Sequence, residues 1–489
     1  MESEMVEVKA VDSSDFLGVS YLFTTKENLS EHTIFKTPWI SNLAYNSCQC
    51  NMEPQTTPNI ETFSKRGQTA VKAGSKFITW DVINDMWHPQ DNASGTLSVG
   101  LAENTLLHDT LLEYINSNVQ LSAEHLTYNN GSMGSKALRK AVSHFLNRHF
   151  NPFRLVEPSH VLMTNGCSSA IEHLSWTLVN PGEGVLLGTP YYSTFIPDIS
   201  LRPEAVVIPV KMGSVHPLSP GAVDEYEKAA TEFEERTGKR VRAVVLCNPH
   251  NPLGRCYPRE TVDRLMRLCQ SRQMHLISDE IYALSVWENR VDKGVPFTPF
   301  ESLLSRDCTG LIDPSLVHVL WGMSKDFGAN GLRVGAIISQ SNPELHTAQK
   351  CLSLYSFVSG MSDQITATIL QDDAFTDRYI EMNREQLSQS HQFLIEALEK
   401  HNIEHSRGCD AGFFVWVNLG EKYLKAHPGE HDHGAALTDI IFQKLLDNKI
   451  LVAHGTAYGS EKIGWFRLVF AHPIPWLAEA MERILRAIQ

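Results

Sequence analysis

The chain has 489 residues, of which 42% are hydrophobic and 20% are charged, and its formal net charge is −14. This composition is typical of a globular protein, and the length predicts two or three domains. The acidic balance, without any basic run, argues against a nucleic-acid partner. Nine cysteines, an odd number in so long a chain, indicate reduced thiols rather than a disulfide framework.

No apolar run approaches the roughly 20 residues that span a bilayer, so we expect no membrane partner. The first fifteen residues are acidic, which fits neither a secretory signal nor an arginine-rich transit peptide. The C-terminal sequence AIQ is not a peroxisomal address. We therefore expect a cytoplasmic protein.

Two groups of possible metal ligands stand out, and neither predicts a metal site. Cys48 and Cys50 are two thiols alone, which are too few for structural zinc. His427, His431 and His433 lie in a Gly/Pro loop without helical spacing. We interpret these histidines as solvated side chains.

Within the first 120 residues, a segment without a regular hydrophobic pattern is followed by a helical pattern. Residues 1–60 are rich in Ser, Thr, Asn and Pro and show no sustained hydrophobic period, which predicts an irregular arm. The segment GLAEN at 100–104 then precedes a helical pattern through Leu111 and Ile115. An acidic residue in this position, here Glu103, is commonly a partner of the helix dipole.

From about residue 159, strand and helix patterns alternate, which is typical of a mostly parallel α/β sheet. The predicted strands are 161–164, 185–187, 206–210, 241–247, 275–278, 317–320 and 334–338. The turn 165–169 between the first strand and a predicted helix at 170–179 is rich in small and hydroxyl residues. Such a turn exposes backbone N–H groups that suit a phosphate, although a capping serine explains it as well.

Unusual residues follow several of the predicted strands. TPYY at 189–192, NPHNPLG at 248–254 and DEIY at 279–282 each come directly after a strand, and so does the loop that contains Lys325. Ligands of open α/β sheets bind beyond the carboxyl ends of the strands. The sequence therefore predicts that these loops form one site.

Lys325 and Arg333 indicate what that site binds. Lys325 lies between two apolar strand candidates, where burial favours the neutral amine that forms a Schiff base with an aldehyde. Arg333, eight residues later, provides a planar cation suited to phosphate. An aldehyde and a phosphate occur together in pyridoxal 5′-phosphate (PLP). On this stretch alone, a loop lysine with a surface arginine is an equal alternative.

After residue 350, a long helical pattern precedes a smaller α+β region with strand candidates at 412–417 and 465–470. Arg467 lies within the second of these apolar strands. A buried arginine needs a partner, which is either a protein carboxylate or the carboxylate of a substrate.

In order along the chain, six motifs resemble the class I and II aminotransferases of the fold-type I PLP enzymes, and most closely the branch that contains 1-aminocyclopropane-1-carboxylate (ACC) synthase. The resemblance spans residues 60–485. It implies an α/β fold of the aspartate aminotransferase-like PLP transferase type, with a mostly parallel sheet in a large domain and a smaller α+β domain. The motifs are GLAEN (100–104), PYY (190–192), NPHNPLG (248–254), SDEIY (278–282), SKD (324–326) and FR (466–467).

The resemblance also implies the domain bounds. Residues 1–60 are expected to form the arm, and residues 61–120 the N-terminal part of the small domain. Residues 121–345 are expected to form the large PLP-binding domain, and residues 346–489 the C-terminal part of the small domain.

By the same resemblance, Lys325 is the Schiff-base lysine that moves the Cα proton, and Asp279 holds the pyridinium nitrogen protonated. Tyr192 is expected to stack on the PLP ring, and Asn251 and Tyr282 to bind its phenolic oxygen. The residues expected to hold the phosphate are Cys167, Ser168, Ser324 and Arg333.

For the substrate, the resemblance implies that Arg467 binds the α-carboxylate and that Glu103 lies near the substrate. It further implies a homodimer. Two positions depart from the family pattern. Gly322 replaces a serine that contacts the phosphate, and Ser132 aligns with a tyrosine that reaches the neighbouring subunit's site in ACC synthases.

Three functions follow from these observations. The first is an aminotransferase acting on an L-amino acid through abstraction of the Cα proton by Lys325, which we favour because it needs no leaving-group machinery. The second is a lyase, either ACC synthase-like or a carbon–sulfur lyase that carries out β- or γ-elimination on an S-substituted amino acid. The third is a non-catalytic PLP-fold module, which the complete set of site residues disfavours.

Overall fold

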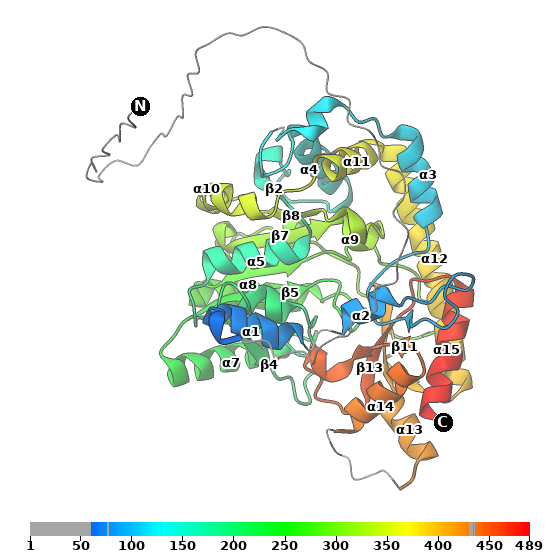
Figure 1. Cartoon of the computed structure of the whole chain (residues 1–489). Helices are drawn as coiled ribbons and strands as arrows, with labels where there is room; N and C mark the ends of the chain where they lie inside the picture. Colours follow the sequence, from blue (N-terminus) through cyan, green and yellow to red (C-terminus); the bar gives the residue numbers. More distant parts are fainter. Residues whose placement is uncertain (1–59, 76–77, 129, 430–433, 435) are drawn as a thin grey trace, which may run out of the picture. The chain divides into compact units, whose positions relative to one another are not determined.

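A computed structural model describes residues 60–489 except 76–77, 129, 430–433 and 435 (Figure 1). The predicted arm, with Cys48 and Cys50, therefore lies outside the described residues apart from Ile60, as do His431 and His433. No described helix is both long and apolar enough to cross a membrane.

The larger sheet has seven strands in the order β2-β8-β7-β6-β5-β3-β4. Strand β8 runs antiparallel to both of its neighbours, and the remaining pairs are parallel. This confirms the predicted α/β fold with a mostly parallel sheet. The strands are β2 (Val161–Thr164), β3 (Gly184–Gly188), β4 (Val206–Val210), β5 (Val241–Cys247), β6 (His275–Asp279), β7 (Val317–Gly322) and β8 (Gly335–Ile338).

Helices cover both faces of this sheet, which explains why its strands read as nearly continuous apolar runs. Alternate strand residues enter two separate cores, because successive side chains of a strand point to opposite faces. In β3, for example, Leu186 packs in one core, and Val185 and Leu187 pack in the other.

The first core includes α4 (Lys136–His149), α7 (Ala222–Thr237), α8 (Arg259–Arg272) and α11 (Gly360–Gln371). The second core includes α5 (Cys167–Leu178), α6 (Phe195–Ser200) and α10 (Pro343–Leu352).

A second, antiparallel sheet has the order β12-β13-β10-β9 and is built from the C-terminal part of the chain. A short parallel pair, β1 (Leu97–Ser98) with β11 (Ile450–Leu451), joins an N-terminal segment to this region. The remaining strands are β9 (Glu404–His405), β10 (Phe414–Asn418), β12 (Ala453–His454) and β13 (Trp465–Val469). The helices beside them are α13 (Leu419–Ala426), α14 (Ala436–Asp447) and α15 (Ile474–Ile488).

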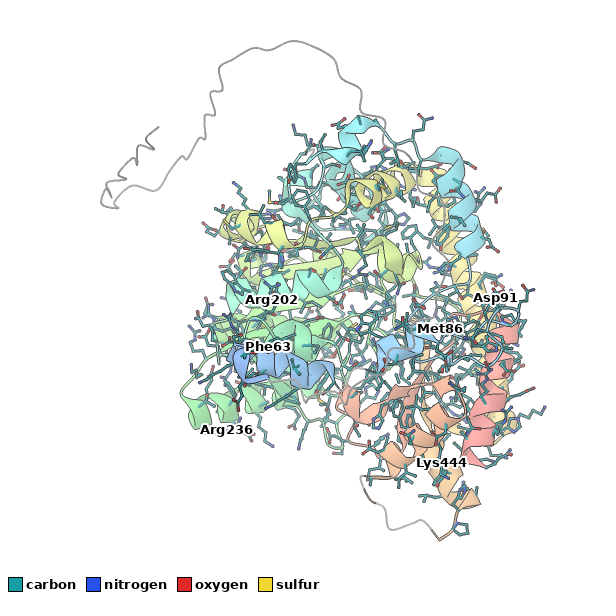
Figure 2. The ribbon with its side chains drawn as sticks, viewed as in Figure 1. Phe63, Met86, Asp91, Arg202, Arg236 and Lys444 are labelled. Atoms are coloured by element: carbon teal, nitrogen blue, oxygen red, sulfur yellow. The ribbon has the colours of Figure 1, made fainter. Side chains whose placement is uncertain are left out.

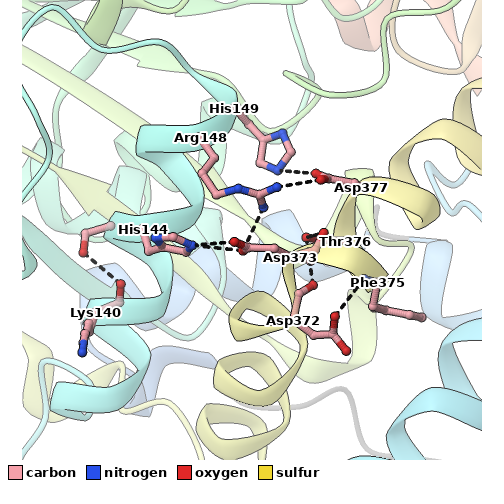
Figure 3. Close-up of polar contacts among 10 residues, drawn as sticks. Lys140, His144, Arg148, His149, Asp372, Asp373, Phe375, Thr376 and Asp377 are labelled. Carbon is pink, nitrogen blue, oxygen red and sulfur yellow. Dashed lines mark hydrogen bonds and ion pairs between the residues drawn. The ribbon is translucent and has the colours of Figure 1, made fainter.

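The helical pattern after residue 350 is divided in two at Asp372, where α11 ends and α12 (Asp373–Lys400) begins. The Asp372 carboxylate caps α12 by accepting from Phe375 N at 2.9 Å, as Figure 3 shows. Arg148 of α4 bonds to Asp373 and Asp377 at 2.9 and 2.6 Å. These contacts fix the first turns of α12 against the large sheet's helices.

The N-terminal helices are α1 (Lys65–Gly74), α2 (Thr79–Asn84) and α3 (His108–Asn118). Phe63 precedes α1 and is labelled in Figure 2. Arg66 of α1 lies 3.8 Å from Glu204, two residues before the edge strand β4. The pair is exposed, so its contribution to stability is small.

Candidate active site at the carboxyl ends of the strands

The three central parallel strands end side by side. Their register pairs Cys247 of β5 with Asp279 of β6, and Asp279 with Leu320 of β7. The segments 248–254 and 280–282 therefore begin at one edge of the sheet, together with the short helix α9 (Met323–Asp326) that carries Lys325. The predicted convergence is confirmed for these three segments. Lys325 itself lies on a helical turn rather than in a loop.

Asp279 is a buried carboxylate with few partners. It is 4% exposed and accepts one described hydrogen bond, from Ile281 N at 3.3 Å. Burial raises its pKa to about 7, although the nearby Lys325 opposes this rise. No described cation lies within ion-pair distance of it. A protonated ring nitrogen would supply the hydrogen-bond donor and the positive charge that this carboxylate lacks.

Lys325 is half-buried, and its Nζ donates to the Ala102 carbonyl oxygen at 2.5 Å. Burial, assisted by the charge of Arg467, lowers its pKa to about 8. Glu103 and Asp279 act in the opposite direction. A lowered pKa makes the neutral, nucleophilic amine accessible near neutral pH.

Arg467 is 1% exposed within β13, and no protein carboxylate pairs with it among the described residues. It donates to Asn251 Oδ1 at 3.0 Å and to the Gly100 carbonyl at 2.6 Å, while its Nε has no partner. The rings of Tyr458 and Phe414 lie 4.9 and 5.3 Å from the guanidinium carbon. This geometry leaves a buried cation ready for an anionic ligand.

The start of α5 forms an anion cradle with Arg333. Gly166 precedes the helix with a φ of 101°, and Cys167 and Ser168 occupy the first two helical positions. A Cβ atom on Gly166 would lie 2.2 Å from Arg333 Nη2, and the positive φ of this residue also favours glycine. The structure therefore brings the predicted turn and Arg333 together, and phosphate binding there stays a prediction. Ser168 is not the capping residue, because Gly166 occupies that position.

Ser324 is buried in α9 beside Lys325. Arg333 is exposed and has a left-handed backbone, with φ at 53°. Its guanidinium donates to the carbonyls of Asn330 and Asn165 at 2.9 and 3.3 Å. Non-glycine residues in this conformation carry strain that often accompanies ligand contacts.

Three further predicted residues lie near Arg467. Asn251 and Tyr282 are each 2% exposed, and Tyr282 packs edge-on against Phe413 and Phe414. Tyr192 is half-buried, and burial raises its pKa to about 12, so its phenol stays neutral. The charge of Arg467 acts on both tyrosines.

The structure gives a physical reason for Gly322. A Cβ atom on this residue would lie 2.6 Å from the Val334 carbonyl oxygen and 3.3 Å from Cys167 Sγ. The Cys167 thiol in turn donates to the Trp321 carbonyl at 3.4 Å. The Val334 carbonyl, just before β8, and the Cys167 thiol therefore already occupy the space that a serine side chain would need.

Ser132 bonds to Ser353, with the two Oγ atoms 2.6 Å apart. Its short side chain is therefore engaged within its own chain. This contact gives the Ser132 hydroxyl a structural role at the position that aligns with a tyrosine in ACC synthases.

Two side chains of this site were not predicted from the sequence. Tyr458 lies over Arg467, and Asp198 of α6 is hydrogen-bonded with Ser168. Burial raises the pKa of Asp198 to about 8, and its Oδ2 has no partner. In the segment PYYSTFIPD at 190–198, this carboxylate lies six residues after Tyr192, in the helix that follows. This proximity in sequence is the only signal that could have indicated Asp198.

These residues fit PLP on observations independent of the family. The cradle of Gly166 and Arg333 suits its phosphate, the amine of Lys325 suits its aldehyde, and the unpaired carboxylate of Asp279 suits its ring nitrogen.

Comparisons with known proteins give the same family as the sequence motifs. Residues 98–484 match the profile of the family "Aminotransferase class I and II". A mouse protein called "Probable inactive 1-aminocyclopropane-1-carboxylate synthase-like protein 2" is 30% identical, with 87% of this chain and 72% of the relative covered. The "Probable aminotransferase sirI" of Leptosphaeria maculans is 32% identical over 82% of this chain and 94% of its own. The "1-aminocyclopropane-1-carboxylate synthase 5" of Oryza sativa is 31% identical over 84% and 76%.

Solved structures support the fold. Aspartate aminotransferase from Thermus thermophilus with maleate has a TM-score of 0.62 at 20% identity, covering 87% of this chain and 99% of that one. Aromatic aminotransferase from Pyrococcus horikoshii has a TM-score of 0.63 at 19% identity, covering 83% and 97%. The predicted aspartate aminotransferase-like fold is confirmed. The chain belongs to the class I and II aminotransferase family, whose members depend on PLP.

Proposed function

We propose that this protein is an aminotransferase that acts on an L-amino acid and uses Lys325 to move the Cα proton. The observation that carries the proposal is the combination of a lysine of lowered pKa, a buried unpaired aspartate and a buried arginine with a free Nε. PLP, when bound, withdraws electrons through its ring and so acidifies the Cα–H bond of a substrate.

Each residue has a proposed part in this reaction. Lys325 takes the Cα proton and returns one, which its pKa of about 8 permits near neutral pH. Asp279 binds the ring nitrogen and keeps it protonated. Tyr192 covers the ring, while Asn251 and Tyr282 bind its phenolic oxygen. The phosphate is held by Cys167, Ser168, Ser324 and Arg333.

Arg467 is proposed to bind the α-carboxylate of the substrate. Its buried position excludes water, which strengthens a charge-assisted hydrogen bond. The free Nε and the two flanking rings define one direction from which a planar carboxylate can approach. The charge of Glu103 raises the pKa of Lys325, so this carboxylate lies near the lysine and is proposed to contact the amino acid.

A lyase is the second candidate, because the relatives include ACC synthases as well as proteins called probable aminotransferases. Both reactions begin with the same proton transfer. The deciding experiment incubates purified protein with PLP and a panel of amino acids and S-substituted cysteines, with and without a keto-acid acceptor. Keto acid formed only with the acceptor means transamination, whereas ammonia and thiol released without it mean elimination.

Lys325→Ala tests catalysis as such. The parent protein is expected to show the visible absorbance of lysine-bound PLP, and the variant is expected to lose both this absorbance and activity. An unchanged spectrum would overturn the assignment of Lys325. A parent protein that binds PLP but converts no amino acid would instead favour the non-catalytic module.

We also propose a homodimer. The described residues include an exposed apolar group near Ser132, in which Tyr128 is 85% and Tyr355 75% exposed. Patches of this kind commonly mark protein interfaces. The group consists of Leu126, Tyr128, Leu354, Tyr355, Phe357 and Met361. Analytical ultracentrifugation of the parent and of Tyr355→Glu tests it. A monomeric parent with full activity would contradict the dimer.

A further inference from the structure

A cavity of about 1120 Å³ lies apart from the candidate active site. Three segments form its walls, namely the loop 286–297 after the Asp279 segment, the first half of α12, and residues 408–410 before β10. At the α4 end it is bordered by His149 and Asp377, which are labelled in Figure 3. Nothing in the proposed reaction uses this space.

The walls of the cavity are acidic. Six carboxylates line it, and three of these have described cationic partners. Arg290 binds Glu385 at 2.7 Å and lies 3.5 Å from Glu288, and Arg148 binds Asp377. The three carboxylates with no cation within ion-pair distance among the described residues are Asp292, Glu381 and Asp410.

Asp410 is the residue that points to a ligand. It is 5% exposed, and its Oδ1 has no hydrogen-bond partner. The guanidinium of Arg255 acts on it only from a distance, because that group donates to the Pro296 carbonyl at 2.8 Å. Burial raises the pKa of Asp410 to about 7. A buried carboxylate oxygen without a donor is costly, and a bound cation removes that cost.

Two observations define the class of cation. First, no three described His, Cys, Asp or Glu side chains come close enough together to hold a metal ion, so the carboxylates are dispersed along the walls. Second, apolar side chains, including Trp287, Phe297 and Ile380, lie between them. Dispersed charges separated by apolar surface match ammonium groups separated by methylene chains.

We infer that this cavity binds a linear aliphatic polyamine, with one ammonium group at Asp410 and others at Glu381 and Asp292. Arg384 also lines the cavity, and its Nε donates to the Leu284 carbonyl at 2.9 Å. The positive charge of Arg384 repels an ammonium group at that end of the cavity. The ammonium groups at Asp410 and Asp292 are therefore expected to bind more tightly than the one at Glu381, which lies one helical turn from Arg384 on α12. Asp292 Oδ2 also accepts from Gly408 N at 2.8 Å.

Isothermal titration calorimetry of the PLP-loaded protein with spermidine tests the inference at physiological ionic strength. One saturable site is expected, and octane-1,8-diol, a neutral chain of similar length, is expected not to bind. Visible absorbance is recorded in parallel, because a primary amine can also react with PLP. Binding at the cavity leaves the absorbance unchanged.

Variants locate the site. Asp410→Asn is expected to weaken spermidine binding by at least about tenfold, the effect of losing one charge-assisted hydrogen bond. Glu381→Gln, at an exposed position of α12, is expected to weaken it by about threefold. Glu396→Gln, exposed on the same helix outside the cavity, is the matched control and is expected to change nothing.

Glu381→Gln also keeps the test decisive if Asp410→Asn does not fold. Equal weakening by Glu381→Gln and Glu396→Gln would mean nonspecific attraction to an acidic protein and would overturn the inference. Binding that changes the visible absorbance and survives both substitutions would place the amine at PLP and would also overturn it. An absence of saturable binding would do the same.

Discussion

Two buried aspartates near Lys325, Asp279 and Asp326, have the same chemistry but different hydrogen-bond partners. Asp326 is 1% exposed and accepts from Ser285 Oγ at 2.7 Å, Leu284 N at 3.2 Å and Trp321 Nε1 at 3.4 Å. Asp279 is equally buried, yet it has one long bond from Ile281 N. Burial raises the pKa of each carboxyl to about 7. Burial alone therefore does not separate a structural carboxylate from a ligand-binding one.

What separates them is the number of unused acceptor positions. A satisfied carboxylate such as Asp326 joins α9 to the segment after β6, and so positions Lys325. An unsatisfied one such as Asp279 is stable only when something else supplies the donor. The same contrast separates two of the buried arginines, Arg483 and Arg467. Arg483 of α15 binds Glu479, Gly95 and Lys449, whereas Arg467 keeps its Nε free.

The largest effect is expected from exchanging each aspartate for asparagine. Asp279→Asn removes the charge that holds the ring nitrogen protonated, so kcat is expected to fall by at least about a hundredfold, as when a preorganised electrostatic group is lost. Asp326→Asn is expected to lower the free energy of unfolding by about 1–3 kcal/mol with a smaller loss of kcat. Steady-state kinetics and urea unfolding measure the two quantities. Equal loss of kcat in both variants would contradict the distinction between a ligand-binding Asp279 and a structural Asp326.

The two arginines give the next largest effect. Arg467→Ala is expected to raise KM for an amino-acid substrate by roughly 10- to 100-fold, the cost of a charge-assisted hydrogen bond, while PLP stays bound. Arg483→Ala is expected to lower stability and to leave KM unchanged, because its donors already have protein partners. Loss of PLP from Arg467→Ala would show that Arg467 has been assigned to the wrong ligand.

The pH dependence of stability sharpens the case of Asp279. In the PLP-free protein its folded-state pKa, about 7, lies above the value of an unfolded aspartate. The folded state therefore binds more protons, and stability from this group is present at low pH and lost as pH rises through 7. Asp279→Asn lacks this loss. Its stability relative to the parent is expected to increase between pH 5 and pH 8 by on the order of a few kcal/mol. A constant difference would contradict the unpaired state of Asp279.

The smallest effect concerns the glycine in place of the family serine. Gly322→Ala is expected to lower the free energy of unfolding by about 1–3 kcal/mol, because its Cβ meets the rigid Val334 carbonyl. Gly331→Ala, in the same loop region, meets nothing within 4 Å and is the control, with a change within about 0.5 kcal/mol. Thermal unfolding compares them. Equal stability would mean that β7 and β8 can move apart.

Much of the fold could be predicted because it depends on local patterns. All seven strands of the large sheet lie where apolar runs predicted them. Three have the predicted bounds, and the ends of the others shift by one or two residues, as for β7, which continues to Gly322. The break at Asp372 was missed, since the apolar period continues across it and only the capping geometry of Asp372 interrupts the helix. The domain bounds and the roles of the site residues remain predictions.

By itself the sequence determined which groups are present, namely a lysine, an aspartate and two arginines beside apolar strands, and hence the cofactor to which they are suited. Only the tertiary structure decided which of these groups have unused hydrogen-bonding positions. Asp279 ends the buried strand β6, and Asp326 ends the short helix α9 that follows the buried strand β7. Their acidic side chains alone do not distinguish them. Their difference comes from Ser285, Leu284 and Trp321, which the packing of α9 brings to Asp326 alone. Unused positions depend on contacts between segments far apart in the chain, and these exist only once the sheet has formed.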